Sequence, residues 1–156
     1  MKSIVAALAL LFAAHAWAGA GDLRLKPCED PKLKQPSKCG TYTVWENRAA
    51  KSGRTIDLNI VVLESTGPNR KPDPLFILLG GPGEGAASDG PDWSVDDPIR
   101  ATRDLVFIDA RGTGKSNGLH CPISKEGPLQ KFMATLNLEV IKAWRSQLEP
   151  HADLRY

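Results

Sequence analysis

An apolar run that ends in a glycine-rich loop constrains the fold of this chain more than any other feature. Residues 75–79 read Leu-Phe-Ile-Leu-Leu, and residues 80–85 read Gly-Gly-Pro-Gly-Glu-Gly. A short, continuously apolar segment that stops at turn residues is typical of a buried strand in a parallel sheet. Glycines at its end leave backbone N–H groups open, because no Cβ stands in the way. The segment therefore predicts an α/β fold with a backbone site for an oxyanion or a phosphate at the carboxyl edge of the sheet.

A second apolar run repeats this arrangement further along the chain. Residues 104–109 read Asp-Leu-Val-Phe-Ile-Asp and lead into an Arg-Gly-Thr-Gly turn at residues 111–114. Between the two runs, residues 95–103 suit a short helix with Ser94 as its N-cap. Two buried strands joined through a helix form a βαβ unit, so we expect a parallel pair of strands.

The remaining predicted elements flank this unit. Residues 41–45 and 55–63 are rich in β-branched and apolar side chains and predict an antiparallel hairpin around a polar turn. Residues 126–134 and 137–149 predict helices, and the second begins at an asparagine N-cap and stops before Pro150. The apolar side chains of this last helix fall at helical spacing and are expected to face the core: Val140, Ile141, Trp144 and Leu148.

Residues 1–18 predict a cleavable signal peptide. Lys2 supplies a positive charge, residues 4–14 are apolar, and Ala-Trp-Ala at residues 16–18 forms a small-x-small cleavage site. The alternative is an uncleaved membrane anchor, which needs about 18–20 apolar residues, more than this run provides. We therefore expect export to the periplasm or the medium, with no membrane attachment after cleavage.

After cleavage, an irregular segment at residues 19–40 is expected to precede one domain at residues 41–156. A chain of this length can build a single modest core. The formal net charge is +2, and loss of Lys2 with the signal peptide lowers it by one. A nearly neutral chain gives no electrostatic reason to expect nucleic acid as a partner.

The chain contains three cysteines. Cys28 and Cys39 enclose a stretch rich in proline and lysine, and a disulfide between them would tie that stretch down. Closing so short a loop contributes about 2–3 kcal/mol to the free energy of unfolding in the chain-entropy model. Cys121 is left over and fits a free thiol, an intermolecular bridge or a missing partner. Because the cysteines lack ligand spacing and His120 adds only one pair, no metal site is expected.

The second glycine turn comes close to a phosphate-binding P-loop. Residues 109–116 fit Gly-x-x-x-x-Gly-Lys-Ser except that Asp109 replaces the first glycine. A carboxylate there would repel phosphate, so nucleotide binding is the least favoured alternative. We instead expect a structural turn, in which Asp109 and Arg111 pair or hydrogen-bond to the backbone and glycines permit positive φ. The expected structural motif comprises Gly83, Asp109, Arg111, Gly112, Gly114 and Ser116.

Taken as a pair, the two loops resemble those of a known family. One apolar strand ends in Gly-Gly-Pro-Gly at residues 80–83, and the other ends in Asp-x-Arg-Gly-x-Gly-x-Ser at residues 109–116. This pair resembles the α/β-hydrolase family of proline iminopeptidases and the related exported tripeptidyl-type serine aminopeptidases. Cys-Gly-Thr-x-Thr-Val at residues 39–44 and Leu-His-Cys-Pro at residues 119–122 are similar to the exported branch. Three positions depart from the family pattern without removing a backbone donor: Trp45, Leu79 and Ala110.

The resemblance implies the N-terminal half of an α/β-hydrolase fold, with an antiparallel strand pair followed by parallel strands and crossover helices. It also implies a serine aminopeptidase that acts on a peptide, or on a small ester or amide, without a metal or organic cofactor. In such enzymes a serine attacks an acyl carbon, and two backbone N–H groups hold the oxyanion. Gly80 or Gly81 would supply one of these donors, and Glu84 would bind the peptide amine or remain solvated.

The chain is expected to lack the rest of the catalytic machinery. No nucleophile elbow of the Gly-x-Ser-x-Gly type is expected, because Ser88 and Ser94 lie near the first glycine loop and Ser116 belongs to the second turn. His120 and His151 lie upstream of the position of a triad histidine. We therefore expect an incomplete N-terminal fragment of a hydrolase, inactive by itself. The alternative is a short non-catalytic binding module built on a hydrolase-like half-fold.

Overall fold

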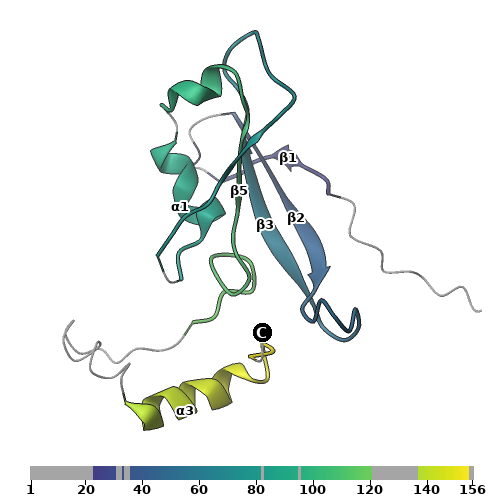
Figure 1. Cartoon of the computed structure of the whole chain (residues 1–156), viewed down its shortest axis with the longest axis vertical. Helices are drawn as coiled ribbons and strands as arrows, with labels where there is room; N and C mark the ends of the chain where they lie inside the picture. The colour runs from purple at the N-terminus through teal and green to yellow at the C-terminus, as the bar shows by residue number, and fades with distance from the viewer. Residues whose placement is uncertain are drawn as a thin grey trace, which may run out of the picture.

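The centre of the fold is a mixed sheet (Figure 1). Its five strands lie in the order β1 (Lys26–Pro27), β2 (Ser37–Trp45), β3 (Thr55–Leu63), β5 (Leu105–Ile108) and β4 (Leu75–Ile77). The computed structural model describes residues 23–30, 33, 36–81, 83–94, 96–120 and 137–154. Neighbouring strands are antiparallel except for β4 and β5, which are parallel. The described residues therefore form an α/β protein, as the sequence predicts at the level of fold class.

The predicted hairpin is confirmed in β2 and β3. Ser37 lies opposite Leu63 at one end of the pair, and Trp45 lies opposite Thr55 at the other. β3 has the predicted bounds, and its burial changes along its length. Near its start, Ile56 is buried between two exposed neighbours, whereas its last four residues are all buried. The strand thus runs from the solvated margin of the sheet into the core, which explains why its alternating pattern becomes continuously apolar.

The predicted parallel pair is confirmed in β4 and β5. Ile77 lies opposite Phe107, although β4 is two residues shorter than the predicted strand at residues 75–79. A helix, α1 (Ala86–Trp93), packs against one face of the sheet over β3 and β5 (Figure 1). The core forms between this helix and the sheet from Val61, Leu63, Ala87, Leu105 and Phe107.

The described part of the segment at residues 19–40 is more regular than predicted. The predicted disulfide between Cys28 and Cys39 is present, with 4.9 Å between the two Cα atoms. Next to it, β1 pairs with the start of β2, and the Cys28 N–H donates to the Ser37 carbonyl at 3.0 Å. β1 was missed because it has only two residues and includes Pro27, which a strand tolerates at the edge of a sheet.

The short helix predicted at residues 95–103 is present only in its middle, and the prediction that Ser94 caps it is wrong. The structure has a 3-10 helix, η1 (Pro98–Ala101), whose N-cap is Asp97 and not Ser94. Asp97 has an extended backbone (φ −66°, ψ 123°), as expected for a residue that precedes a proline. A helix from residue 95 to residue 103 would have to pass through this extended position, so the proline divides the predicted element.

The helix α1 has no counterpart among the predicted elements. It contains Gly90 and Pro91, two residue types that weaken helices, so its sequence carries little helical signal. Gly90 has a packing role, because a Cβ there would lie 2.6 Å from Cδ1 of Phe107. Close contact with the sheet, and not helical propensity, therefore determines this element.

The C-terminal helix α3 (Leu138–Leu148) is confirmed, but the environment of its apolar stripe is not. The Asn137 side chain accepts the Glu139 N–H at 2.9 Å and caps the helix as predicted. No residue of α3 is buried: within the predicted stripe Ile141 is 43% exposed, and Val140, Trp144 and Leu148 are half-buried. The expectation that the stripe faces the core is therefore wrong, because no described element covers it.

Some predictions fall outside the described residues. These are the signal peptide at residues 1–18, the helix at residues 126–134 and the state of Cys121. Within the described ranges, no helix has the length and apolar character needed to cross a membrane.

Candidate functional site

Asp109, directly after β5, is fully buried and joins three parts of the fold. Its Oδ1 accepts the backbone N–H groups of Ala87 at 2.7 Å and Ser88 at 3.2 Å, both at the start of α1. Its Oδ2 accepts the Ser88 hydroxyl at 3.1 Å, the Asn59 amide at 2.9 Å and the Lys115 N–H at 2.9 Å. One carboxylate therefore connects β3, the start of α1 and the second glycine turn.

Two glycines pack directly against this carboxylate. A Cβ at Gly85 would lie 2.7 Å from Oδ1 of Asp109 and 2.9 Å from Cα of Gly114. A Cβ at Gly114 would collide with Oδ2 of the same carboxylate. Since Gly85 ends the first glycine loop and Gly114 belongs to the second, the two loops form one packed unit around Asp109.

The second turn is also fixed to β3 through Ser116. Gly112 and Gly114 adopt positive φ values of +78° and +47°, and the Gly112 N–H donates to the Ser116 carbonyl at 2.9 Å. The Ser116 side chain is fully buried, and its Oγ accepts the Asn59 N–H at 2.8 Å. Ser116 therefore holds the turn against the strand that also contributes Asn59 to the Asp109 carboxylate.

The geometry of this turn differs from that of a P-loop. In a P-loop the chain enters a helix after the lysine, and backbone N–H groups are free for phosphate. Here Asn117 has a positive φ of 55°, and residues 118–120 have no regular structure. The Lys115 N–H is already bound to Asp109. The position of a phosphate is thus occupied by an internal carboxylate.

The same turn contains a serine motif that the sequence analysis overlooked. Residues 114–118 read Gly-Lys-Ser-Asn-Gly and satisfy the bare Gly-x-Ser-x-Gly pattern. A nucleophile elbow presents an exposed serine at a sharp strand-to-helix turn. Ser116 is 0% exposed and lies in a turn that no helix follows in the described residues up to residue 120. The pattern is therefore present without the geometry that makes such a serine nucleophilic.

Arg111 anchors the second turn to the end of the β2–β3 hairpin. Its Nη1 donates to the carbonyl oxygens of Trp45 at 3.0 Å and Glu46 at 2.8 Å. Burial lowers the pKa of the Arg111 guanidinium, the charge of Arg48 lowers it further, and Glu46 opposes both effects. An arginine side chain stays protonated in proteins, so Arg111 remains a positively charged anchor.

The first glycine loop presents open backbone at the end of β4. Gly80 and Gly81 are both exposed, and Gly81 and Gly83 adopt positive φ values of +111° and +93°. A Cβ at Gly80 would meet no described atom within 4 Å. At Gly81 a Cβ would lie 2.7 Å from the carboxyl carbon of Glu84, whose N–H donates to the Gly81 carbonyl at 3.2 Å. The loop thus combines bare backbone at Gly80 with a carboxylate beside Gly81.

Sequence analysis missed three partners of Asp109. The sequence pattern assigns Asn59 no role beyond its place in the strand at residues 55–63, yet its N–H donates to Ser116 Oγ and its side chain donates to Asp109. Ser88 was considered only as a nucleophile, and Ala87 contributes a backbone N–H, which leaves no trace in the side-chain pattern. Of these three residues, only Asn59 carries a signal in the sequence, because it is a polar residue directly before the buried part of β3.

A cavity of about 550 Å³ lies beside the Asp109 network. Lys115 and Asp30 form an ion pair at its wall, with 3.7 Å between Nζ and Oδ2. The residues that line it include Asp30, Cys39, Asn59, Ser88, Asp92 and Lys115. The cavity therefore adjoins two of the side chains that bind the Asp109 carboxylate.

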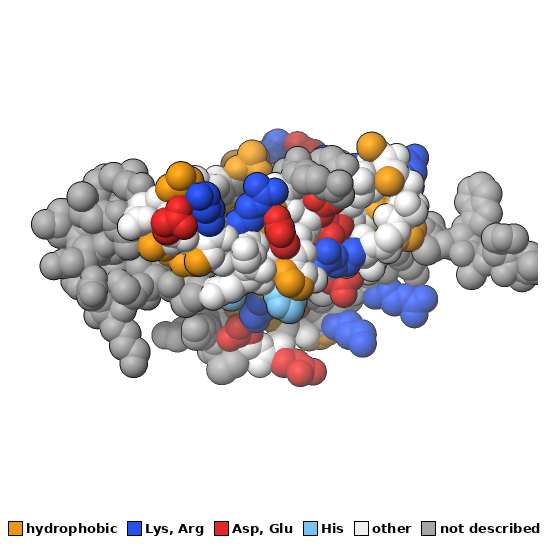
Figure 2. Space-filling model, turned by 90° about the horizontal axis from the view of Figure 1, so that it is seen from below, with side chains coloured by type: hydrophobic (Ala, Val, Ile, Leu, Met, Phe, Trp, Pro, Cys, Tyr) orange, Lys and Arg blue, Asp and Glu red, His pale blue; other side chains and the backbone are white. Residues whose placement is uncertain are grey.

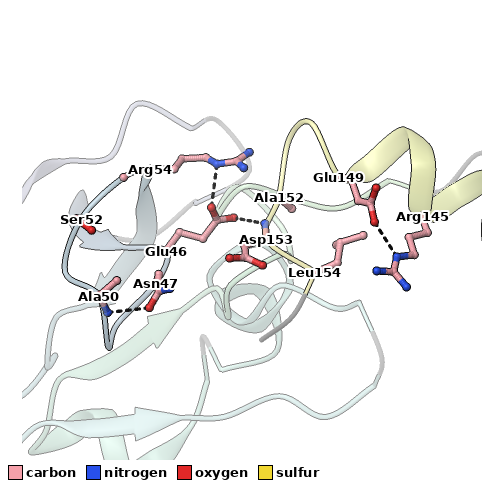
Figure 3. A pocket seen from close by; sticks show the side chains of 11 residues that line it. Glu46, Asn47, Ala50, Ser52, Arg54, Arg145, Glu149, Ala152, Asp153 and Leu154 are labelled. Atoms are coloured by element: carbon pink, nitrogen blue, oxygen red, sulfur yellow. Dashed lines mark hydrogen bonds and ion pairs between the residues drawn. The ribbon is translucent and has the colours of Figure 1, made fainter.

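A second cavity, of about 470 Å³, lies between the hairpin turn and the C-terminal segment (Figure 3). Glu46 projects into it, accepts the Asp153 N–H at 2.8 Å and forms an ion pair with Arg54 at 2.8 Å. On the opposite wall, Arg145 and Glu149 form another ion pair at 2.7 Å. These four charged side chains neutralise one another in pairs. None of the residues that line this cavity belongs to either glycine loop.

The surface charges do not indicate a particular ligand. On the face seen in Figure 2, acidic and basic side chains are interspersed. His120 and His151 are both exposed. Within the described part of the chain, no three His, Cys, Asp or Glu side chains gather in a way that could hold a metal ion.

Comparisons with known proteins add no relative to this picture. A scan against protein-family models found no match, and a search of the curated proteins found none. Among the residues that the structure describes, the fold and the site together define an α/β arrangement with a mixed five-stranded sheet and two glycine loops joined at a buried carboxylate.

Proposed function

We propose that this protein is an exported serine hydrolase of the α/β-hydrolase type that acts as an aminopeptidase. Its first glycine loop supplies one side of the oxyanion hole, through the N–H of Gly80 or Gly81. The nucleophile, the acid and the histidine of the catalytic triad lie outside these 156 residues. The proposal rests on the family-like motifs at residues 80–83 and 109–116 and on one geometric observation.

That observation is an open backbone at Gly80 within a loop that is held in place from the neighbouring strand. β4 and β5 are parallel, so the loops that follow them leave the sheet at the same edge. Gly80 is exposed at this edge and a Cβ on it would meet no described atom within 4 Å, while Asp109 binds the start of the helix that follows the loop. An oxyanion hole requires donors that are both accessible and fixed before the reaction begins.

The proposed reaction proceeds through an acyl-enzyme. The serine Oγ attacks the acyl carbon and transfers its proton to the histidine, while the carbonyl oxygen becomes an oxyanion. The N–H of Gly80 or Gly81 donates to that oxyanion, and each such donor typically stabilises the transition state by about 2.7–4 kcal/mol. Collapse of the intermediate expels the amine, which takes up the proton, and water then hydrolyses the acyl-enzyme.

The position of Glu84 favours a substrate that carries an amine. Its carboxylate lies beside Gly81, where an unpaired negative charge would oppose a developing oxyanion. The ammonium group of a peptide N-terminus would neutralise this charge, whereas a simple ester or amide would not. Export is supported by the pattern at residues 1–18, and the Cys28–Cys39 disulfide is compatible with it.

A serine-directed fluorophosphonate probe tests this proposal. We expect no labelling of the purified 156-residue chain, and labelling of the native protein isolated from its source with an antibody against this chain. A peptide with a free N-terminus should compete with the label more strongly than its N-acetylated counterpart. Failure of the native protein to react overturns the proposal. A native product with no more than these 156 residues and no reactivity would favour the non-catalytic binding module.

A further inference from the structure

We infer that Asp109 is a positioning residue that fixes the orientation of the Gly80 and Gly81 backbone. The inference rests on the proposed function only in naming those two N–H groups as the oxyanion donors. The structural claim is that the carboxylate after β5 controls the order of the loop after β4.

The first loop is anchored at both of its ends. At one end, β4 is hydrogen-bonded to β5, with Leu75 opposite Leu105. At the other end, Gly85 leads into α1, whose N–H groups at Ala87 and Ser88 bind Asp109. Between these anchors, Gly80 and Gly81 are exposed, and the Gly81 carbonyl accepts a local hydrogen bond from the Glu84 N–H at 3.2 Å. The orientation of their N–H groups therefore depends on the two anchors.

Asp109 is the principal cap of α1. The N-cap residue, Gly85, has no side chain that could accept a hydrogen bond from the helix. Without the Asp109 carboxylate, the Ala87 N–H would be buried with no acceptor, which is unfavourable. The start of α1 and the loop that leads into it are then expected to loosen together.

Asp104 provides a matched control at the other end of the same strand. Like Asp109, it is a buried aspartate that flanks β5. Its Oδ1 accepts the Ser65 N–H at 2.9 Å, and its Oδ2 pairs with Arg70. Since these partners do not belong to the glycine loop, replacement of Asp104 should destabilise the fold without loosening Gly80 and Gly81.

The test is backbone ¹⁵N relaxation on the 156-residue chain. In the unaltered chain we expect order parameters of about 0.85 at Gly80 and Gly81, the value of a rigid backbone. In Asp109→Asn an NH2 group replaces one acceptor oxygen and faces N–H donors either at α1 or at Asn59 and Lys115, so the network cannot be fully satisfied. Both order parameters should then fall below about 0.6, while those of β3 are unchanged. In Asp104→Asn they should stay at the original value. If Asp109→Asn does not fold, Ser88→Ala removes one donor from the same network and should lower both order parameters by a smaller amount.

Two results would overturn the inference. One is an unchanged order at Gly80 and Gly81 in folded Asp109→Asn, or in folded Ser88→Ala if the first variant is unfolded. The other is an equal loss of order in Asp104→Asn, which would show that the loop responds only to global stability. Because the measurement reports backbone order and not catalysis, the structural inference can be confirmed even if the native protein fails to react with the fluorophosphonate probe.

Discussion

The carboxylate of Asp109 accepts the backbone N–H of Ala87 at 2.7 Å, although the two residues are 22 positions apart in the sequence. The same carboxylate accepts the Lys115 N–H at 2.9 Å. Backbone donors that would bind an external anion in a phosphate site are therefore bound to a fixed anion of the protein itself. This arrangement joins the two glycine loops and argues against phosphate binding at the second of them.

Nucleotide should consequently have no effect on stability. We expect the melting temperature of the 156-residue chain to be the same with and without magnesium ATP at a concentration of several millimolar. The physical reason is that Asp109 places a negative charge at the second turn and occupies the Lys115 and Ala87 N–H groups, which would otherwise be free for phosphate there. Differential scanning fluorimetry measures this, with magnesium chloride alone as the control. A reproducible rise with ATP would contradict our interpretation of the turn.

Two glycines of the first loop should respond differently to alanine. A Cβ at Gly85 would push into the Asp109 carboxylate and Gly114, so Gly85→Ala should lower the free energy of unfolding by about 1–3 kcal/mol. Gly80→Ala meets no described neighbour and should change it by less than about 0.5 kcal/mol. Urea denaturation of both variants provides the comparison. Equal effects would mean that Gly85 is not packed against the carboxylate.

Much of the sheet could be predicted because its strands carry their own signals. The β3 segment and the parallel pair were visible as apolar runs, and the Cys28–Cys39 disulfide followed from the composition of the loop that it closes. These features depend on side chains that are neighbours in sequence. Their burial in a sheet then follows from general rules.

The helix α1 could not be predicted, because what stabilises it is remote in sequence. Its own residues include Gly90 and Pro91, and its cap comes from Asp109, which follows β5 directly. The stripe of α3 shows the opposite case, in which Ile141 has the right helical spacing but no described element covers it. Periodicity specifies which face of a helix is apolar, but tertiary contacts decide whether that face is buried.

Loss of the disulfide should destabilise the fold. Cys28→Ser combined with Cys39→Ser is expected to lower the free energy of unfolding by about 2–3 kcal/mol, because the bridge restricts the unfolded chain. Both proteins should carry Cys121→Ser, so that no third thiol can exchange. Reduction of the parent protein should reproduce the shift in a urea denaturation curve. An unchanged curve would contradict the structural role of this bridge.

The edge of the sheet at β4 should promote self-association of the 156-residue chain. β4 is an edge strand among the described residues. Phe76, on this strand, is 57% exposed, and Leu78, directly after it, is 88% exposed. Exposed apolar edges pair with other chains. Sedimentation velocity should show association that rises with concentration and is reduced by Phe76→Lys. Leu23→Lys, at another exposed apolar position, is the control and should have little effect.

Our central proposal is that the glycine loops of this chain serve a nucleophile that is encoded further along the same gene. Sequencing the native transcript beyond the Tyr156 codon tests this claim most directly. The account predicts an open reading frame that continues into a Gly-x-Ser-x-Gly segment at a strand-to-helix turn, followed by an acidic residue and a histidine. A stop codon immediately after Tyr156 in the native transcript would contradict it.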